Sequence, residues 1–117
     1  MHFQPGETNI ICTNAEASLH FYRDILGFTF VEEEGGAYRL AAGERTYLLL
    51  PLATEERPEH PYCSTPEFSL DLYVENVSEA YTYLKESGVT FARHWEEGKP
   101  SCIIRDPDGL VVEVIQR

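Results

Sequence analysis

Three acidic residues are the side chains whose types and positions point first to chemistry. Glu113 stands inside the apolar run from Leu110 to Ile115, where a charged side chain is unexpected. Glu7 opens an apolar-alternating stretch near the N-terminus, and Asp71 lies within another such stretch. Carboxylates in partly apolar surroundings can bind cations, ligate divalent metals or move protons. These three residues are therefore the first candidates for a functional site.

Strand alternation predicts which residues share a face with these carboxylates, because successive side chains of a strand point to opposite faces. If the aliphatic faces of the strands pack on helices, all three carboxylates lie on the opposite faces. Those faces also hold a mixture of polar, aromatic and aliphatic residues: Asn9, Ile11, Ser69, Tyr73, Val111 and Ile115. Such a mixture is typical of a partly apolar ligand cleft. The alternative is a solvated sheet face, which antiparallel sheets commonly have.

The composition predicts one globular domain and restricts its ligands. The chain has 117 residues, of which 43% are hydrophobic and 12% aromatic, which favours a real core over disorder. It carries 20 acidic and 9 basic residues, a formal net charge of −11. This charge argues against a nucleic-acid partner, which requires a basic surface to neutralise phosphates. A cationic or neutral small molecule fits better.

The sequence predicts a cytoplasmic protein without membrane contact. No stretch approaches the roughly 20 consecutive apolar residues of a membrane span, and residues 1–6 lack the basic and apolar regions of a signal peptide. Three cysteines, Cys12, Cys63 and Cys102, lack Cys-x-x-Cys spacing. They indicate buried, reduced thiols rather than a disulfide framework or a zinc ribbon.

A weak internal repeat organises the chain. Residues 14–30 resemble residues 76–91, with one residue fewer between the landmarks of the second copy. In each copy an Asn suited to cap a helix follows a strand pattern, a 3.6-residue apolar stripe predicts the helix, and a Gly ends it. The predicted strands are residues 8–13, 28–34, 37–42 and 46–50, then 68–74, 90–96, 101–106 and 110–116.

This layout predicts an α+β fold of two tandem βαβββ modules in a single domain, 1–117. Module one covers residues 7–52 and module two covers 68–117. The segment between them, 53–67, holds three prolines among glutamates, which is typical of a linker or a lid. Asp106-Pro107-Asp108-Gly109 has the chemistry of a hairpin turn, with Gly tolerating positive φ.

Trp95 is a further candidate, on the strand predicted after the second helix. Its indole can stack on an aromatic or cationic ligand, although a core or dimer-interface position is the alternative. Arg39 and Arg105 can clamp an anion, and each is also a natural salt-bridge partner in so acidic a protein. No Ser-His-Asp or Cys-His arrangement is indicated by the spacing.

Two motifs resemble the vicinal oxygen chelate superfamily, which includes glyoxalase I, bleomycin-resistance proteins and extradiol dioxygenases. They are Phe21-Tyr22-Arg23-Asp24-Ile25-Leu26-Gly27-Phe28 and Arg105-Asp106-Pro107-Asp108-Gly109 with the following Glu113. The resemblance covers nearly the whole chain, but these motifs report on fold more than on chemistry. It implies two βαβββ modules that form a curled mixed sheet around a cleft, often within a homodimer.

The resemblance also implies positions for metal ligands, because metal-using members hold a divalent ion by side chains of the first and last strands of each module. Here those positions fall at Glu7 and Glu113. The first strand of the second module offers Ser69, where a His is common. The last strand of the first module offers Tyr47-Leu48-Leu49-Leu50, without carboxylate or imidazole, and Tyr47 is included among the ligand-binding candidates. Two carboxylates alone make a weak metal site, even if Asp71 adds a third oxygen.

We therefore expect a small-molecule-binding protein resembling the bleomycin-resistance branch, without a cofactor. Its cleft would sequester a cationic or aromatic ligand with Glu7, Asn9, Tyr47, Ser69, Asp71, Tyr73, Trp95 and Glu113. The alternative is a metal-dependent glyoxalase-like lyase or isomerase, or a dioxygenase-like enzyme, with Mn, Ni, Zn or Fe at Glu7 and Glu113 and with Glu113 as the catalytic carboxylate. A third possibility is an assembly module whose cleft is vestigial.

Overall fold

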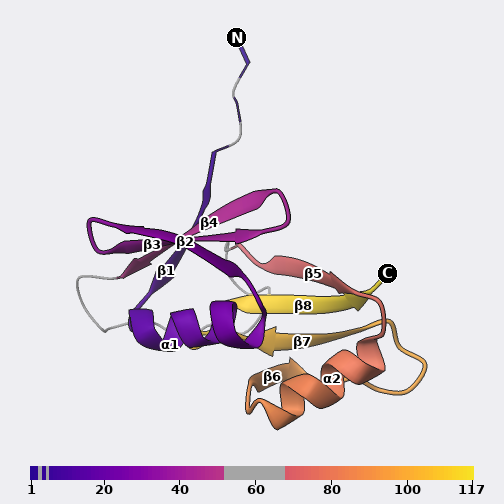
Figure 1. Cartoon of the computed structure of the whole chain (residues 1–117). Coiled ribbons are helices and arrows are strands. Elements are labelled where there is room, and N and C mark those ends of the chain that lie inside the picture. Colours follow the sequence, from indigo (N-terminus) through magenta and orange to yellow (C-terminus); the bar gives the residue numbers. More distant parts are fainter. Residues whose placement is uncertain (3, 5, 52–67) are drawn as a thin grey trace. The chain divides into compact units, whose positions relative to one another are not determined.

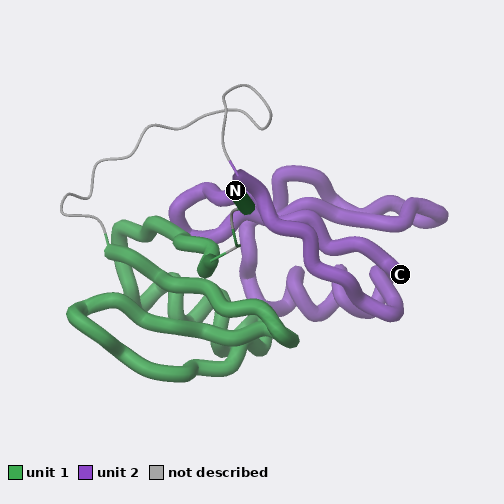
Figure 2. The backbone as a smooth tube through the Cα atoms, turned by 90° about the horizontal axis from the view of Figure 1, so that it is seen from above, with its two compact units in different colours: residues 1–56 green, residues 57–117 purple. Residues whose placement is uncertain are grey.

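The two copies of the sequence repeat correspond to two compact units. The computed structural model describes residues 1–2, 4, 6–51 and 68–117. The units are Met1–Glu56 and Arg57–Arg117, green and purple in Figure 2. In each, a strand, a helical segment and three further strands follow one another along the chain (Figure 1). This confirms the predicted α+β fold with two βαβββ modules.

The element bounds agree closely with the strand patterns in the sequence. Unit 1 contains β1 (Thr8–Cys12), α1 (Ala15–Leu19), η1 (His20–Ile25), β2 (Thr29–Glu34), β3 (Ala37–Ala42) and β4 (Arg45–Pro51). Unit 2 contains β5 (Leu70–Val74), α2 (Val77–Glu86), β6 (Thr90–Arg93), β7 (Ser101–Arg105) and β8 (Val111–Gln116).

Each unit has a four-stranded mixed sheet, and both sheets have the same topology. The strand orders are β1-β4-β3-β2 and β5-β8-β7-β6. The first strand of each unit pairs in parallel with its last strand, and the other pairs are antiparallel. How the two sheets curl around a common cleft stays a prediction.

One face of each sheet packs on its helix and forms the core, as the alternation predicts. In β1, Ile10 and Cys12 are buried whereas Ile11 is 48% exposed. In β8, Val112 and Val114 are buried on the helix side, but Val111 on the opposite face is also buried, at 2% exposure. We use the term second face for the side of each sheet turned away from its helix, because it places the candidate residues.

Both helical segments begin at an Asn whose side chain caps the first turn. The Asn14 side-chain oxygen accepts a hydrogen bond from the Ala17 N–H, and Asn76 accepts from the Glu79 N–H, each at 3.0 Å. These bonds satisfy backbone donors that lack a partner within the helix. Gly27 and Gly88 follow the helices with φ of 81° and 78°, which confirms their predicted role.

The first helix differs from the regular helix that its apolar stripe predicts. After α1 the chain continues as the π-helix η1, where the Leu26 N–H bonds to the Phe21 carbonyl, five residues back, at 2.9 Å. Ser18 of α1 and Phe21 and Tyr22 of η1 are buried. The apolar stripe missed Ser18 because serine is not an apolar residue, although Ser18, Phe21 and Tyr22 keep the i, i+3, i+4 spacing of a regular helix.

The Asp106-Pro107-Asp108-Gly109 turn is held by the first aspartate. The Asp106 carboxylate accepts hydrogen bonds from the N–H groups of Asp108 and Leu110, both at 2.8 Å. Gly109 has a φ of 89°, a conformation that side chains disfavour. Arg105 donates to the Gly109 carbonyl at 2.9 Å. The hairpin turn is confirmed, and it fixes the register that carries Glu113.

The predicted end of one strand is wrong. β6 ends at Arg93 rather than Glu96, because a bulge interrupts its pairing with β7 and Gly98 turns the chain. The predicted linker or lid, residues 53–67 with Cys63, lies outside the described part of the chain. In the described residues, no helix is long and apolar enough to cross a membrane. Cys12 and Cys102 are buried and not in a disulfide.

Candidate functional site

The second face of unit 1 is organised around a guanidinium group. Asn9, Leu48, Arg39 and Glu32 follow one another across β1, β4, β3 and β2. Arg39 Nε and Nη2 donate to the two carboxylate oxygens of Glu7, at 2.7 and 3.1 Å. Its Nη1 donates to Glu32 and lies 3.7 Å from a Glu34 oxygen. A single cation thus links three carboxylates of unit 1.

The Arg39 hydrogen bonds determine the protonation of Glu7. The guanidinium holds the pKa of the Glu7 carboxyl below its ordinary value of 4.5, by hydrogen bonding first and by charge as well. Glu7 is thus an ionised, salt-bridged carboxylate with both oxygens already bound. Such a group is a poor proton carrier near neutral pH.

The second face of unit 2 brings two predicted carboxylates side by side. Asp71 of β5 and Glu113 of β8 are directly paired in the parallel register. Glu113 Oε2 accepts a hydrogen bond from the Ser101 hydroxyl at 2.8 Å, and Arg93 donates to that hydroxyl. The Arg93 Nη2 atom lies 3.7 Å from the same Glu113 oxygen. Among the described residues, Asp71 has no hydrogen bond or salt bridge.

Tyr73 extends this face beside the carboxylates. It lies two residues after Asp71 on the same strand face, pairs with Ile115 of β8, and is 56% exposed. The Arg117 guanidinium carbon lies 4.5 Å above the centre of its ring. The second face of unit 2 therefore combines an unpaired carboxylate, a supported carboxylate and an accessible aromatic ring.

Two predicted ligand-binding residues lie elsewhere. Tyr47 is on the helix side of β4, 8% exposed, with its ring 5.3 Å from that of Phe28, so it does not share the second face with the carboxylates, and its role in binding stays a prediction. Trp95 follows β6 in a loop, where its indole N–H donates to the Lys99 carbonyl and its ring packs on Tyr81 of α2. It contributes to an aromatic cluster around α2 rather than to the second face.

The remaining candidates are Asn9 and Ser69. Asn9 lies on the second face of unit 1, in the row that includes Arg39. Ser69 is exposed immediately before β5. Their roles in binding stay predictions.

Sequence reasoning missed the groups that support Glu113. Ser101 could have been found, because alternation along β7 puts it on the same face as Glu113. Alternation could not place Arg93 on this face, because the bulge in β6 shifts its register. Cys102 lies near this network on the other face; burial raises the pKa of its thiol, which argues against a reactive cysteine.

The described residues do not fit the metal site that the resemblance implies. They contain no group of three or more His, Cys, Asp or Glu side chains able to hold an ion together. Glu7 already has both carboxylate oxygens bound by Arg39. Divalent-ion sites normally require more ligands, supported by further hydrogen bonds.

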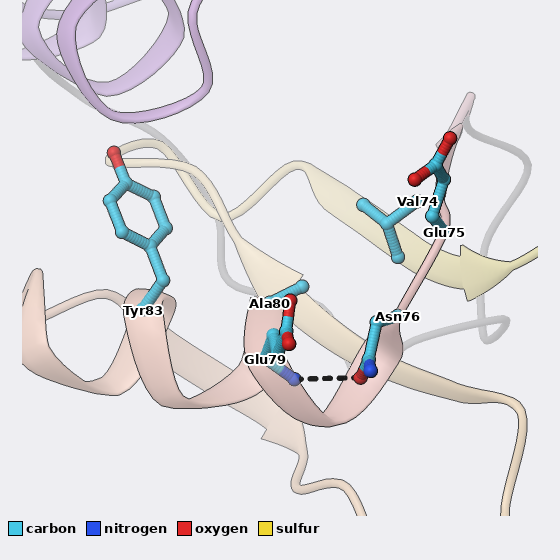
Figure 3. A pocket seen from close by; sticks show the side chains of 6 residues that line it. All are labelled: Val74, Glu75, Asn76, Glu79, Ala80 and Tyr83. Carbon is cyan, nitrogen blue, oxygen red and sulfur yellow. Dashed lines mark hydrogen bonds between the residues drawn. The ribbon is translucent and has the colours of Figure 1, made fainter.

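An open groove at the β5–α2 junction is a separate feature of unit 2. Figure 3 shows its lining, which comes from the end of β5 and the first turns of α2: Val74, Glu75, Asn76, Glu79, Ala80 and Tyr83. The dashed line marks the Asn76 cap on the Glu79 N–H. Because the cap already satisfies this backbone donor, the groove offers less to an anion than an uncapped helix end would. None of the predicted site residues lines it.

Comparison with protein families identifies the chain. The model of the Glyoxalase/Bleomycin resistance protein/Dioxygenase superfamily matches residues 4–114. The chain belongs to this superfamily, as the two motifs predict. No curated protein is similar enough to the chain to count as a match.

Solved structures share the fold at low sequence identity. A lactoylglutathione lyase from Agrobacterium tumefaciens is 23% identical with a TM-score of 0.68, and the alignment covers 97% of this chain and 92% of that one. A glyoxalase family protein from Enterococcus faecalis is 22% identical with a TM-score of 0.74, covering 97% of both chains. A hypothetical protein from S. aureus is 18% identical with a TM-score of 0.75, covering 100% and 96%. These likenesses concern the fold alone.

Proposed function

We propose that this superfamily member is a small-molecule-binding protein whose ligand is cationic or aromatic and is held by the second face of unit 2. The observation that carries the proposal is the in-register pair of Asp71 and Glu113, of which Asp71 has no cationic partner among the described residues. Two neighbouring carboxylates repel one another when both are ionised, and a bound cation relieves that repulsion. Tyr73 adds an apolar and aromatic surface next to them.

The supporting contacts of Glu113 agree with a binding role. The Ser101 hydroxyl and Arg93 both lie at Oε2, so one carboxylate oxygen is fixed and the other remains for a ligand. Ser101 is 5% exposed, and a hydrogen bond from so buried a hydroxyl restrains the Glu113 side chain. A carboxylate restrained in this way loses less conformational entropy when a ligand binds.

The salt bridge between Arg39 and Glu7 in unit 1 reduces the number of carboxylates available to a cationic ligand. Glu7 was expected to contribute to an acidic cleft, but the Arg39 guanidinium neutralises it. We therefore assign cation binding to Asp71 and Glu113 rather than to all three carboxylates.

A ligand screen tests this function. Thermal shift with paired compounds, each cation beside a neutral compound of the same shape, should identify cations that raise the melting temperature. Titration calorimetry on a hit should then show weaker binding to Glu113→Ala and Asp71→Asn, with Glu33→Gln as a control that removes a carboxylate from β2 of unit 1. Unchanged affinity in both site variants would reject the assignment, and no hit in a broad screen would favour an assembly module.

Metal analysis tests the enzymatic alternative. We propose that binding requires no cofactor, so protein purified without a tag or chelator should hold little Mn, Ni, Zn or Fe, before or after these ions are added. Near-stoichiometric metal that Glu7→Gln or Glu113→Gln removes would instead support a glyoxalase-like or dioxygenase-like enzyme. The predicted homodimer and cytoplasmic location are separate proposals, testable by light scattering and by cell fractionation.

A further inference from the structure

The Tyr73 ring already has a planar cation lying on it. The guanidinium carbon of Arg117 is 4.5 Å from the ring centre, within the range of a cation–π interaction. Arg117 has no salt bridge to a carboxylate among the described residues, although the whole chain carries 20 acidic side chains. The ring therefore holds a cation that could otherwise pair with a carboxylate.

The backbone positions Arg117 for this contact. Tyr73 pairs with Ile115 in the parallel register, and the Arg117 N–H donates to the Val74 carbonyl at 2.9 Å. Because side chains alternate along β8, Arg117 follows Glu113 and Ile115 on the second face. The guanidinium contact is thus a consequence of sheet pairing rather than an isolated surface encounter.

We propose that Tyr73 is the binding position for a planar cation, a guanidinium or amidinium group, and that Arg117 fills this position until a ligand displaces it. This inference rests on the proposed function and specifies its ligand class. Arg117 acts as an internal competitor, so its removal strengthens ligand binding.

Asp71 gives such a ligand an interaction that Arg117 does not make. Asp71 and Tyr73 are two residues apart on one strand face, a separation of about 6.6 Å along the strand. A planar amidinium that lies on the Tyr73 ring, as the Arg117 guanidinium does, can direct its N–H groups to the Asp71 carboxylate. The two contacts together favour an aromatic amidine or guanidine over a simple ammonium ion.

Benzamidine is the probe, and neutral benzamide is its matched comparison. Titration calorimetry should show benzamidine binding that benzamide lacks. The Arg117→Ala variant should bind benzamidine about two- to fivefold more tightly than wild type, which is the loss of one exposed cation–π competitor. Arg45→Ala, which removes an exposed arginine of β4 in the other unit, controls for the change in net charge.

Nuclear magnetic resonance reports the displacement directly. Protons of the Arg117 side chain lie above the Tyr73 ring and should resonate upfield; Tyr73→Leu should abolish this shift while Tyr73→Phe keeps it. Benzamidine should move the Arg117 resonances towards their Tyr73→Leu positions.

The outcomes separate this inference from the function on which it rests. Equal benzamidine affinity in wild type and Arg117→Ala overturns the competition but leaves cation binding intact. Equal binding of benzamide and benzamidine overturns the cation preference. If neither benzamidine nor any other cation binds any variant, both the inference and the proposed function fail.

Discussion

The two units share one topology but use their second faces differently. Equivalent positions of the two sheets hold different residues, namely Asn9 and Asp71, Leu48 and Glu113, Arg39 and Ile103, and Ala37 and Ser101. In unit 1 a central arginine pairs with the surrounding carboxylates. In unit 2 an apolar residue takes the position of that arginine, and two carboxylates lie next to each other.

This difference shows that a repeated fold does not imply a repeated site. The strand order and register conserve which positions face away from the helix, but the residues at those positions differ, with Arg39 in unit 1 where unit 2 has Ile103. In unit 1, Arg39 pairs with the neighbouring carboxylates. Unit 2 leaves Asp71 for an external partner, so the proposed binding function belongs to unit 2.

The largest expected effects concern the helix sides, where the units should behave alike. Leu40 and Ile104 occupy equivalent positions and are both fully buried. Leu40→Ala and Ile104→Ala should each lower the free energy of unfolding by about 2–5 kcal/mol, because each leaves a cavity in a packed core. Urea unfolding followed by circular dichroism measures this. A large loss in one variant and a negligible one in the other would contradict the equivalence of the two cores.

Ser101 should matter in unit 2 where its counterpart in unit 1 does not. Ser101→Ala removes the hydroxyl that donates to Glu113 and should cost about 1 kcal/mol, a typical net value for a hydrogen bond. Ala37→Ser is the matched control, since position 48 in unit 1 offers a leucine instead of a carboxylate. Stabilisation by Ala37→Ser as large as the loss in Ser101→Ala would show that the effect is not specific to Glu113.

Substitutions at the equivalent positions 71 and 9 should change ligand binding in unit 2 only. Asp71→Asn should weaken benzamidine binding about two- to fivefold, as expected for an exposed charge pair of roughly 0.4–1 kcal/mol. Asn9→Asp adds a carboxylate to the equivalent position of unit 1, close to Arg39 in the same row, and should not create a second site. A calorimetric stoichiometry of two in Asn9→Asp would refute the contrast between the faces.

The smallest expected effect is the contribution of Glu7 to stability at low pH. Its pKa is lowered in the folded protein by Arg39, so its contribution to stability is complete above the ordinary value of 4.5 and is lost as the pH falls through the folded pKa. Glu7→Gln should therefore reduce the fall in the urea midpoint between about pH 5 and pH 3. Glu33→Gln, outside the Arg39 network on the same strand as Glu32, should change this slope less. If the urea midpoint fell equally steeply with pH in wild type and Glu7→Gln, the Glu7–Arg39 pair would not contribute to stability.

The fold was largely predictable because its signals are local. Apolar alternation located the eight strands of the described residues, and Asn14 and Asn76 marked the helix starts because a side-chain cap acts within one turn. Tyr47 shows where alternation fails. It stands in the run Tyr47-Leu48-Leu49-Leu50, in which both faces are apolar, so only the pairing of Thr8 with Tyr47 decides which side faces the helix.

The site was predictable in its positions but not in its partners. Alternation correctly placed Asp71, Tyr73 and Glu113 on one face. It carried no information on which arginine meets which carboxylate, because Arg39 and Glu7 are 32 residues apart and meet only through sheet pairing. A bulge also moved Arg93 out of simple alternation, and so its approach to Glu113 could not be found from spacing.

The π-helix η1 explains why the first repeat is one residue longer than the second. A bond across five residues encloses one residue more than a bond across four, so η1 absorbs an insertion inside the helix and leaves the strands on either side in register. The first module can thus differ in length from the second without any loop change. Insertions and deletions within helices are then a route by which duplicated modules diverge, and removal of one residue from His20–Ile25 should regularise the helix while preserving both sheets.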